Sequence, residues 1–256
     1  MKFVRGRAHR FLTAGPKAMT RVLVTRPEPG ATRTLEILKS RGHAAEIISL
    51  TEISPIGYDL PTHTFDAIII TSQNAIMHGA ALLAAFKTKP VFTVGKRTAD
   101  MLVTEGHIVL AWAETADDLL PLIKNHSHKN LLYISGQARR PQLETGLHAA
   151  GFQICTIETY RSSAMSNAAD LLTVFFRSNE KAVILFYAPS AAQTFVEALR
   201  GTNPPVSTRY LCISNAVASQ LPQSWQNAVT IAARPDDATM MAQLDKMLAH
   251  DHLPQA

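Results

Sequence analysis

The sequence has few cysteines and no long hydrophobic run. Cys155 and Cys212 are its only cysteines, and each lies in an apolar, strand-like stretch. Two isolated thiols make neither a disulfide framework nor a zinc site, so we interpret both as buried side chains and expect a reducing, cytoplasmic setting. No stretch approaches the roughly 18 apolar residues of a membrane span, and no secretory signal pattern is present, so we expect no membrane attachment.

Excess charge is missing from most of the chain. The net charge is +5, yet five basic residues and no acidic residue precede Met19, and beyond it 20 basic residues face 20 acidic ones. This balance argues against a broad nucleic-acid-binding surface. The basic leader, residues 1–18, also resembles an organelle transit peptide, but we favour a disordered extension or a start at Met19.

Several fingerprints of cofactor and metal chemistry are also missing. There is no G-x-G-x-x-G, no P-loop, no G-x-S-x-G elbow and no zinc motif. The predicted strands end in Thr, Ser, Gly and Ala rather than Asp, which argues against a phosphoacceptor receiver domain. The acid pairs 117–118 and 236–237 stand at predicted helix starts, which favours capping over metal binding. His126 and His128 lie in a polar loop without a third ligand nearby, so we interpret them as surface residues.

The most informative stretch is residues 65–76. Residues 67–70 are an unbroken apolar run, typical of a strand buried on both faces of a parallel sheet. Small polar residues follow at 71–74, and a helix-like pattern then continues to about Phe86. Ser72 or Asn74 can cap that helix. The carboxyl end of a parallel strand that faces a helix N-terminus is a typical anion site.

The same pattern recurs in the second half of the chain. Four stretches match in the same order: 68–70 with 184–186, 91–99 with 210–218, 117–118 with 236–237, and 21–24 with 130–133. They predict two tandem copies of one α/β pattern, and 256 residues suffice for two domains. The residues alone place the domain boundary near 125–130.

Two strand ends carry candidate ligand-binding residues. Gly95 closes a strand where the backbone must turn tightly or approach a ligand. Lys96, its basic neighbour and Thr98 then form the first turn of a predicted helix. Positive charge at a helix N-terminus is unfavourable, because the helix dipole favours acidic residues there. A residue choice that conflicts with local helix preference is typical of a functional site. The alternative is that the two basic residues are simply solvated at the edge of a loop. Arg26, at the end of the first strand, is a ligand-binding arginine, a surface arginine or a partner of a helix end.

Together these motifs resemble the uroporphyrinogen-III synthase family. The resemblance spans roughly residues 20–248. It rests on T-R-P at 25–27, T-S-x-N at 71–74, V-G-x-x-T-A at 94–99, a G-x-x-V-like segment ending at Tyr160, and an S-P-S-A-like stretch at 188–191. Ser214 and Val217 stand where the family usually has Gly and Thr, and Ala188 replaces the first Ser of S-P-S.

The resemblance implies a fold of two flavodoxin-like, parallel-sheet α/β domains joined by a two-stranded β linker. One domain then comprises residues 1–50 plus 163–256, and the other residues 54–158. The linker strands are 50–54 and 158–162. A cleft of hydroxyls and helix N-termini between the two hinged domains is expected to hold the substrate.

The implied activity is that of a cyclising lyase of haem biosynthesis. It closes hydroxymethylbilane to uroporphyrinogen III with loss of water and inversion of ring D, without a cofactor. We expect a monomer with no nucleic-acid or membrane partner, and transfer of the substrate from hydroxymethylbilane synthase is a candidate interaction. A non-catalytic two-domain binding protein or an inactive relative is the alternative, because of the changes at Ser214 and Val217.

The resemblance also implies roles for individual residues. Tyr160 is the expected proton donor to the departing water, since a phenol with an ordinary pKa near 10 is protonated at neutral pH. A tyrosine that only packs the linker is the alternative. No metal ligand is expected, and the expected substrate-binding residues are Arg26, Ser72, Gln73, Asn74, Gly95, Lys96, Thr98, Ala99, Ser135, Gly136, Pro189, Ser190 and Asn215.

Overall fold

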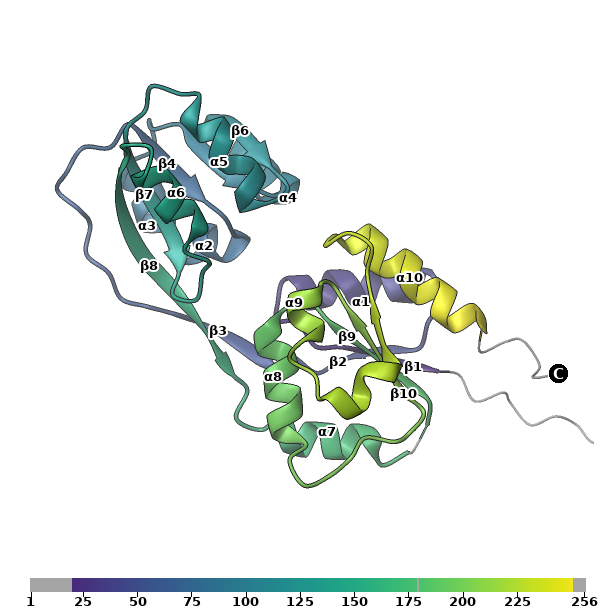
Figure 1. Ribbon diagram of the computed structural model, residues 1–256. Helices are drawn as coiled ribbons and strands as arrows, with labels where there is room; N and C mark the ends of the chain where they lie inside the picture. The colour runs from purple at the N-terminus through teal and green to yellow at the C-terminus, as the bar shows by residue number, and fades with distance from the viewer. Residues whose placement is uncertain (1–19, 179, 251–256) are drawn as a thin grey trace, which may run out of the picture. The chain divides into compact units, whose positions relative to one another are not determined.

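The structure, a computed structural model, describes residues 20–178 and 180–250. The expected leader and alternative start at Met19 lie outside these residues. Contacts divide the chain into two compact units, one reaching up to Leu50 and resuming at Met165, the other comprising residues 51–164. Each unit is a mainly parallel sheet with helices against its faces (Figure 1), which confirms the predicted α/β class.

The first unit contains a five-stranded parallel sheet in the order β11-β10-β9-β1-β2. Its strands are β1 (Arg21–Val24), β2 (Ala45–Ile47), β9 (Ala182–Phe186), β10 (Thr208–Cys212) and β11 (Val229–Ile231). Its helices are α1 (Gly30–Ser40), α7 (Ala168–Phe176), α8 (Pro189–Ala198), α9 (Asn215–Ala218) and α10 (Asp237–His250), with the 3-10 helix η1 (Gln223–Ala228).

Side chains of the first unit's strands enter two apolar layers, because successive residues of a strand point to opposite faces. On one face Leu23 and Ile184 pack with Phe195 and other residues of α7, α8 and α9. On the other, Val22 and Val183 pack with α1 and α10. Burial on both faces explains why these strands read as continuous apolar runs.

The second unit contains a six-stranded sheet in the order β3-β8-β7-β4-β5-β6. Its strands are β3 (Thr51–Pro55), β4 (Ala67–Ile70), β5 (Val91–Val94), β6 (Val109–Ala113), β7 (Asn130–Gly136) and β8 (Gln153–Ala164). Its helices are α2 (Gln73–His78), α3 (Ala80–Ala85), α4 (Lys96–Thr104), α5 (Ala116–Lys124) and α6 (Gln142–His148). Residues of α2, α3 and α4 line one apolar layer, and those of α5 and α6 line the other.

All pairs in the second sheet are parallel except one. β3 runs antiparallel to the last part of β8, with Thr51 opposite Ala164 and Pro55 opposite Tyr160. The linker strand expected at 158–162 is therefore part of a longer strand, β8.

The sequence repeat reappears as a shared strand order. The first unit runs β2-β1-β9-β10-β11 and the second, apart from β3, runs β8-β7-β4-β5-β6. Strands β4, β5 and β7 thus occupy the positions of β9, β10 and β1, as the sequence matches predict. The boundary near residues 125–130 is wrong, because β7 follows it and pairs with β4, which precedes it, from Leu131 opposite Ala67 to Ile134 opposite Ile70.

The helix expected to reach Phe86 is split into α2 and α3 at Gly79. A Cβ at Gly79 would lie 2.5 Å from the Ala75 carbonyl oxygen and 2.5 Å from Cγ2 of Ile134. The glycine therefore permits a close approach between this helical segment and β7.

The two loop histidines are not simple surface residues. Both are half-buried, and the rings of His126 and His128 lie 5.0 and 6.2 Å from the ring of Phe92. The surface interpretation is wrong because the loop folds back over β5.

The capping interpretation of the acid pairs is confirmed. The Thr115 hydroxyl accepts a hydrogen bond from the backbone N–H of Asp118 at 3.1 Å, and Oδ1 of Asp236 accepts one from the N–H of Thr239 at 2.7 Å. These bonds satisfy orphan donors of α5 and α10.

Candidate functional site

The predicted site residues follow the carboxyl ends of parallel strands within each unit. Those of the second unit lie after β4 (Ser72, Gln73, Asn74), after β5 (Gly95, Lys96, Thr98, Ala99), at the end of β7 (Ser135, Gly136) and in β8 (Tyr160). Those of the first unit lie after β1 (Arg26), after β9 (Pro189, Ser190) and after β10 (Asn215). The direction in which the chain adds strands to the sheet reverses between β4 and β7 and between β1 and β9. Doubly wound sheets bind ligands at such switch points.

Ser72 is the N-cap of α2. Its backbone is extended, with φ −155°, and its hydroxyl accepts a hydrogen bond from the N–H of Asn74 at 3.1 Å. The predicted cap is thus confirmed for Ser72. Among the described residues Oδ1 of Asn74 is buried without a hydrogen-bond partner.

Tyr160 lies against residues of α2 with its N-cap and of β7. Its ring is 5.9 Å from that of His78, and its phenol lies near the Ser72 side chain. A Cβ at Gly136 would lie 2.5 Å from Cζ of Tyr160, so only glycine leaves room for this ring. Burial raises the pKa of Tyr160 above 10.0, and the nearby Ser72 side chain opposes that shift only in part. The phenol is therefore protonated at neutral pH.

The turn after β5 requires glycine. Gly95 has φ +84°, in the left-handed region, and serves as N-cap of α4. Thr98 is 4% exposed and Ala99 is also buried, so both face the interior of the second unit. Lys96 pairs with Asp100 at 2.8 Å on the exposed surface of α4, which partly offsets its unfavourable place at a helix start.

A charged network lies beside the end of β7. Arg139 donates from Nε to Glu144 at 3.0 Å and from Nη1 to Glu158 at 2.7 Å and to the carbonyl of Gly136 at 3.3 Å. Burial alone would raise the pKa of Glu144, but hydrogen bonds from Thr156 and Arg139 outweigh burial and lower it. Glu144 is therefore ionised at neutral pH, and the network braces the loop after β7.

Sequence reasoning missed Arg139. Its partners lie 3, 5 and 19 residues away on different elements, so no local period marks it. A usable signal was the basic residue soon after the Ser-Gly at the end of β7, where the chain leaves the sheet.

In the first unit, the Arg26 side chain is fixed by contacts with other residues of that unit. Its Nη1 donates to Oδ1 of Asp237 at 2.9 Å, and its guanidinium lies 4.2 Å from the centre of the Tyr187 ring. A Cβ at Gly30 would lie 2.4 Å from Nε of Arg26, so this glycine admits the side chain over the start of α1. Asp237 is the first residue of α10, which ties the end of β1 to that helix.

The helices that follow β9 and β10 begin without a side-chain cap. Ala188 is the N-cap of α8 and Ser214 that of α9, and neither side chain bonds to the helix. Pro189 starts α8, Ser190 follows it half-buried, and Asn215 is exposed. The replacement of serine by Ala188 thus leaves the first N–H groups of α8 without a side-chain acceptor at that position.

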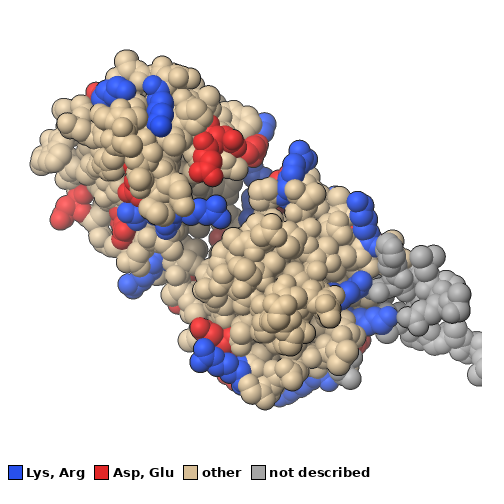
Figure 2. Space-filling view, in the orientation of Figure 1, with Lys and Arg blue, Asp and Glu red and all other residues tan. Residues whose placement is uncertain are grey.

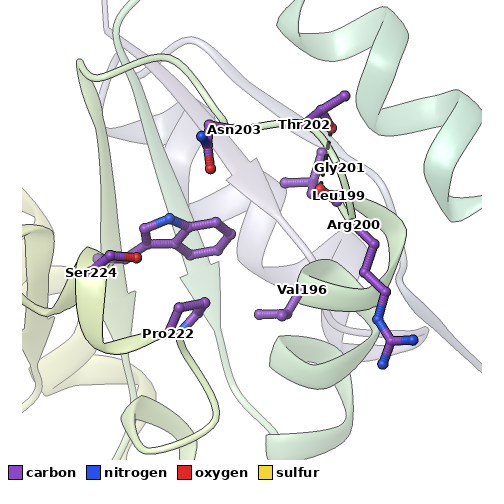
Figure 3. Close-up of a pocket in the computed structure, with 9 residues that line it drawn as sticks. Val196, Leu199, Arg200, Gly201, Thr202, Asn203, Pro222 and Ser224 are labelled. Atoms are coloured by element: carbon purple, nitrogen blue, oxygen red, sulfur yellow. Dashed lines mark hydrogen bonds between the residues drawn. The ribbon is translucent and has the colours of Figure 1, made fainter.

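A separate hollow of about 360 Å³ lies in the first unit, at the end of α8 (Figure 3). Its walls include Leu199, Asn203, Pro222 and Trp225, which precede β10 and β11. It therefore lies at the amino ends of these strands, and none of the predicted site residues lines it. Arg200 points away from Asn203 and Ser224, so its charge is not directed into the hollow (Figure 3).

Neither a metal cluster nor a membrane span is found in the part of the chain that the structure describes. No group of three or more His, Cys, Asp or Glu side chains among residues 20–178 and 180–250 is placed to hold a metal ion. Over the same residues, no helix is long and apolar enough to cross a membrane. On the face shown in Figure 2, basic and acidic side chains occur in small scattered groups.

Comparison with known proteins points to one family. The family described as "Uroporphyrinogen-III synthase HemD" matches residues 32–242. The uroporphyrinogen-III synthase of Saccharomyces cerevisiae is 23% identical over 215 residues, which are 73% of this chain and 78% of that protein.

Solved structures agree with the fold. The uroporphyrinogen-III synthetase of Helicobacter pylori superposes with a TM-score of 0.61 at 19% identity, over 90% of this chain and all of that one. A mutant uroporphyrinogen III synthase of Thermus thermophilus superposes with a TM-score of 0.57 at 14% identity, over 91% of this chain and all of that one.

Proposed function

We propose a reaction for this chain, which belongs to the uroporphyrinogen-III synthase family. It closes hydroxymethylbilane to uroporphyrinogen III with loss of water and inversion of ring D. The chain is accordingly a cyclising lyase of haem biosynthesis. The substrate is a flexible polycarboxylate that also closes without inversion, so the enzyme must impose the geometry of closure.

The proposed proton donor is Tyr160, and the proposal rests on the surroundings of its phenol. Its phenol is half-buried and in contact with the cap of α2, and burial keeps it protonated at neutral pH. Departure of the hydroxyl of the hydroxymethyl group as water breaks its C–O bond and requires a proton, and a positioned acid supplies one at the leaving oxygen. We assign this step to Tyr160. The electrophile left behind is then attacked by the substituted carbon of ring D.

Binding of the carboxylates is assigned to the strand ends. Hydroxyls and helix N-termini accept anions without a strong base nearby. In the second unit we assign this role to the Ser72 hydroxyl and to the start of α4, where Gly95 and Thr98 lie, and in the first unit to Ser190 and Arg26. The complete set assigned here is Arg26, Ser72, Gln73, Asn74, Gly95, Lys96, Thr98, Ala99, Ser135, Gly136, Pro189, Ser190 and Asn215.

The test is a coupled assay with freshly generated hydroxymethylbilane, followed by separation of the oxidised porphyrin isomers. The full chain is expected to yield mainly the type III isomer. Tyr160→Phe is expected to lower kcat at least about a hundredfold with little change in KM, since general acids contribute about 10²–10⁴-fold.

Tyr210→Phe is the matched control, because Tyr210 is buried in the core of the first unit and is not among the assigned residues. Only type I product from a folded sample would overturn the enzymatic assignment and leave a binding protein on this fold. Full turnover by Tyr160→Phe would overturn the proton-donor role alone.

We further propose that the protein works without a cofactor, as a cytoplasmic monomer that receives its substrate from hydroxymethylbilane synthase. The family assignment supports this proposal, since the preceding enzyme releases an unstable substrate. Sedimentation at assay concentration tests the monomer. A fixed complex with further copies of the chain would contradict it.

We also propose the domain bounds 1–50 with 163–256, and 54–158, linked by strands 50–54 and 158–162. The division of contacts after residues 50 and 164 supports the split into a discontinuous and a continuous domain, and it groups residues 51–164, β3 and β8 included, in one unit. Calorimetry is expected to resolve two unfolding transitions. A destabilising change confined to residues 54–158 that shifts both transitions equally would contradict the proposal.

A further inference from the structure

A β-bulge lies immediately before Tyr160. In the ladder between β7 and β8, Ser135 is opposite Glu158, but Gly136 is opposite Tyr160, so Thr159 is an extra residue. Side chains of a regular strand alternate between faces. Without the bulge Tyr160 would point to the same face as Glu158.

The bulge instead places Tyr160 on the face of α2. Its ring lies near His78 and packs with the apolar layer that α2, α3 and α4 line. Thr159 points to the same face, because its methyl group is 3.6 Å from a Cβ built at Gly79. Two consecutive side chains on one face are what a bulge produces. Glu158 stays on the opposite face, where Arg139 and α6 lie.

Arg139 joins the two sides of the bulge. Its Nη1 donates to Glu158, directly before the bulge in β8, and to the carbonyl of Gly136, opposite Tyr160 in β7. Its Nε donates to Glu144 in α6, which keeps the guanidinium in place. The N–H of Gln137 donates to the carbonyl of Tyr160 at 2.9 Å and continues the ladder past the extra residue.

We propose that Arg139 is a positioning residue for Tyr160: it holds the bulge in β8 against the end of β7, so that the phenol points toward the cap of α2. Arg139 does not touch the phenol and acts through Glu158 and Gly136. The proposal rests on the function proposed above, in which Tyr160 donates the proton, and it adds the residue that sets the direction of that donor.

The kinetic test compares Arg139→Ala with Arg140→Ala, a matched change at the exposed neighbouring arginine. Arg139→Ala is expected to lower kcat about tenfold while KM stays within about twofold, because a small misplacement of a reacting group slows the step more than it weakens binding. Arg140→Ala is expected to match the unmodified chain.

Arg139→Lys separates position from charge. Lysine keeps the positive charge but lacks the planar fork that reaches two carboxylates and a carbonyl at once. The lysine variant is therefore expected to stay impaired. Full recovery by lysine would overturn the proposal, since it would assign the effect to charge alone.

A second measurement does not depend on turnover. The chain is labelled with 3-fluorotyrosine, and the Tyr160 resonance is assigned from Tyr160→Phe. Arg139→Ala is expected to move or broaden that resonance and to leave the one of Tyr210, in the first unit, unchanged. Gly136→Ala is expected to move it too, because the new methyl group would displace the ring.

The two readouts separate the possible failures. If the unmodified chain forms only type I product while Arg139→Ala still moves the Tyr160 resonance, the proposed function fails and the positioning of Tyr160 stands. If the resonance and kcat of Arg139→Ala both match those of Arg140→Ala, the positioning role is refuted.

Discussion

Gly79→Ala provides a sharp stability test, because the new methyl group meets atoms that have little freedom to move. Its Cβ would lie 2.5 Å from the Ala75 carbonyl oxygen and from Cγ2 of Ile134, whereas carbon atoms in contact normally lie about 3.5–4.0 Å apart. The Ala75 oxygen accepts the N–H of Gly79 at 2.9 Å and closes α2. Ile134 is fully buried in β7. Neither partner can retreat by about 1 Å without disturbing the backbone or the core.

The magnitude follows from two opposing effects. Overpacking of a well-packed interior costs about 1–3 kcal/mol, and two hard contacts place Gly79→Ala at the upper end. The substitution also removes conformational freedom from the unfolded chain, which stabilises by about 0.4–1 kcal/mol. The net loss in the free energy of unfolding is about 2 kcal/mol. For a unit of this size it corresponds to a fall in Tm of about 8 °C.

The assay is urea and thermal unfolding followed by circular dichroism. Gly57→Ala is the matched control, since a Cβ there meets nothing within 4 Å, and it is expected to leave Tm unchanged or to raise it slightly. If Gly79→Ala unfolds at the midpoint of the unmodified chain, the claim that the close approach to β7 requires glycine at position 79 is refuted.

Two further predictions concern ionisation. The backbone N–H of Asn130 donates to the Asp66 carboxylate and holds its pKa below 3.8, so the stabilisation it provides is present above about pH 4 and is lost as pH falls through the folded-state pKa. Asp66→Asn should therefore flatten the fall in urea midpoint below pH 4, and an unchanged slope would contradict this assignment. Burial raises the pKa of Cys212 to about 12, so an aromatic disulfide reagent at pH 8 should label only Cys155 in the folded chain. Rapid labelling in Cys155→Ser would show that Cys212 is accessible.

Local patterns predicted much of the candidate site. A cap such as Ser72 depends on bonds within the first turn of a helix, and the need for Gly95 depends on one backbone angle. Such features involve neighbours in the chain, so residue type and spacing identify them.

The site residues with distant partners were harder to interpret. Arg26 was placed at a strand end with a helix end as one possible partner, but the sequence did not show which helix, and its partner Asp237 is 211 residues away. Arg139 was missed because its role depends on a bulge in β8, and a bulge is defined by the register of two strands rather than by either strand alone.

The sequence by itself determined the α/β class, the repeated strand-turn-helix units and the capped helix starts. These depend on hydrophobic periodicity and on bonds between near neighbours. The residue patterns by themselves did not decide which units share a sheet: the family resemblance implied the grouping, and the tertiary structure shows it. The repeat favours two consecutive halves, yet β1 pairs with β9 and β4 pairs with β7. Strand pairing depends on contacts far apart in the chain, and any buried parallel strand offers similar hydrogen bonds, so the choice of partner is made when the cores assemble.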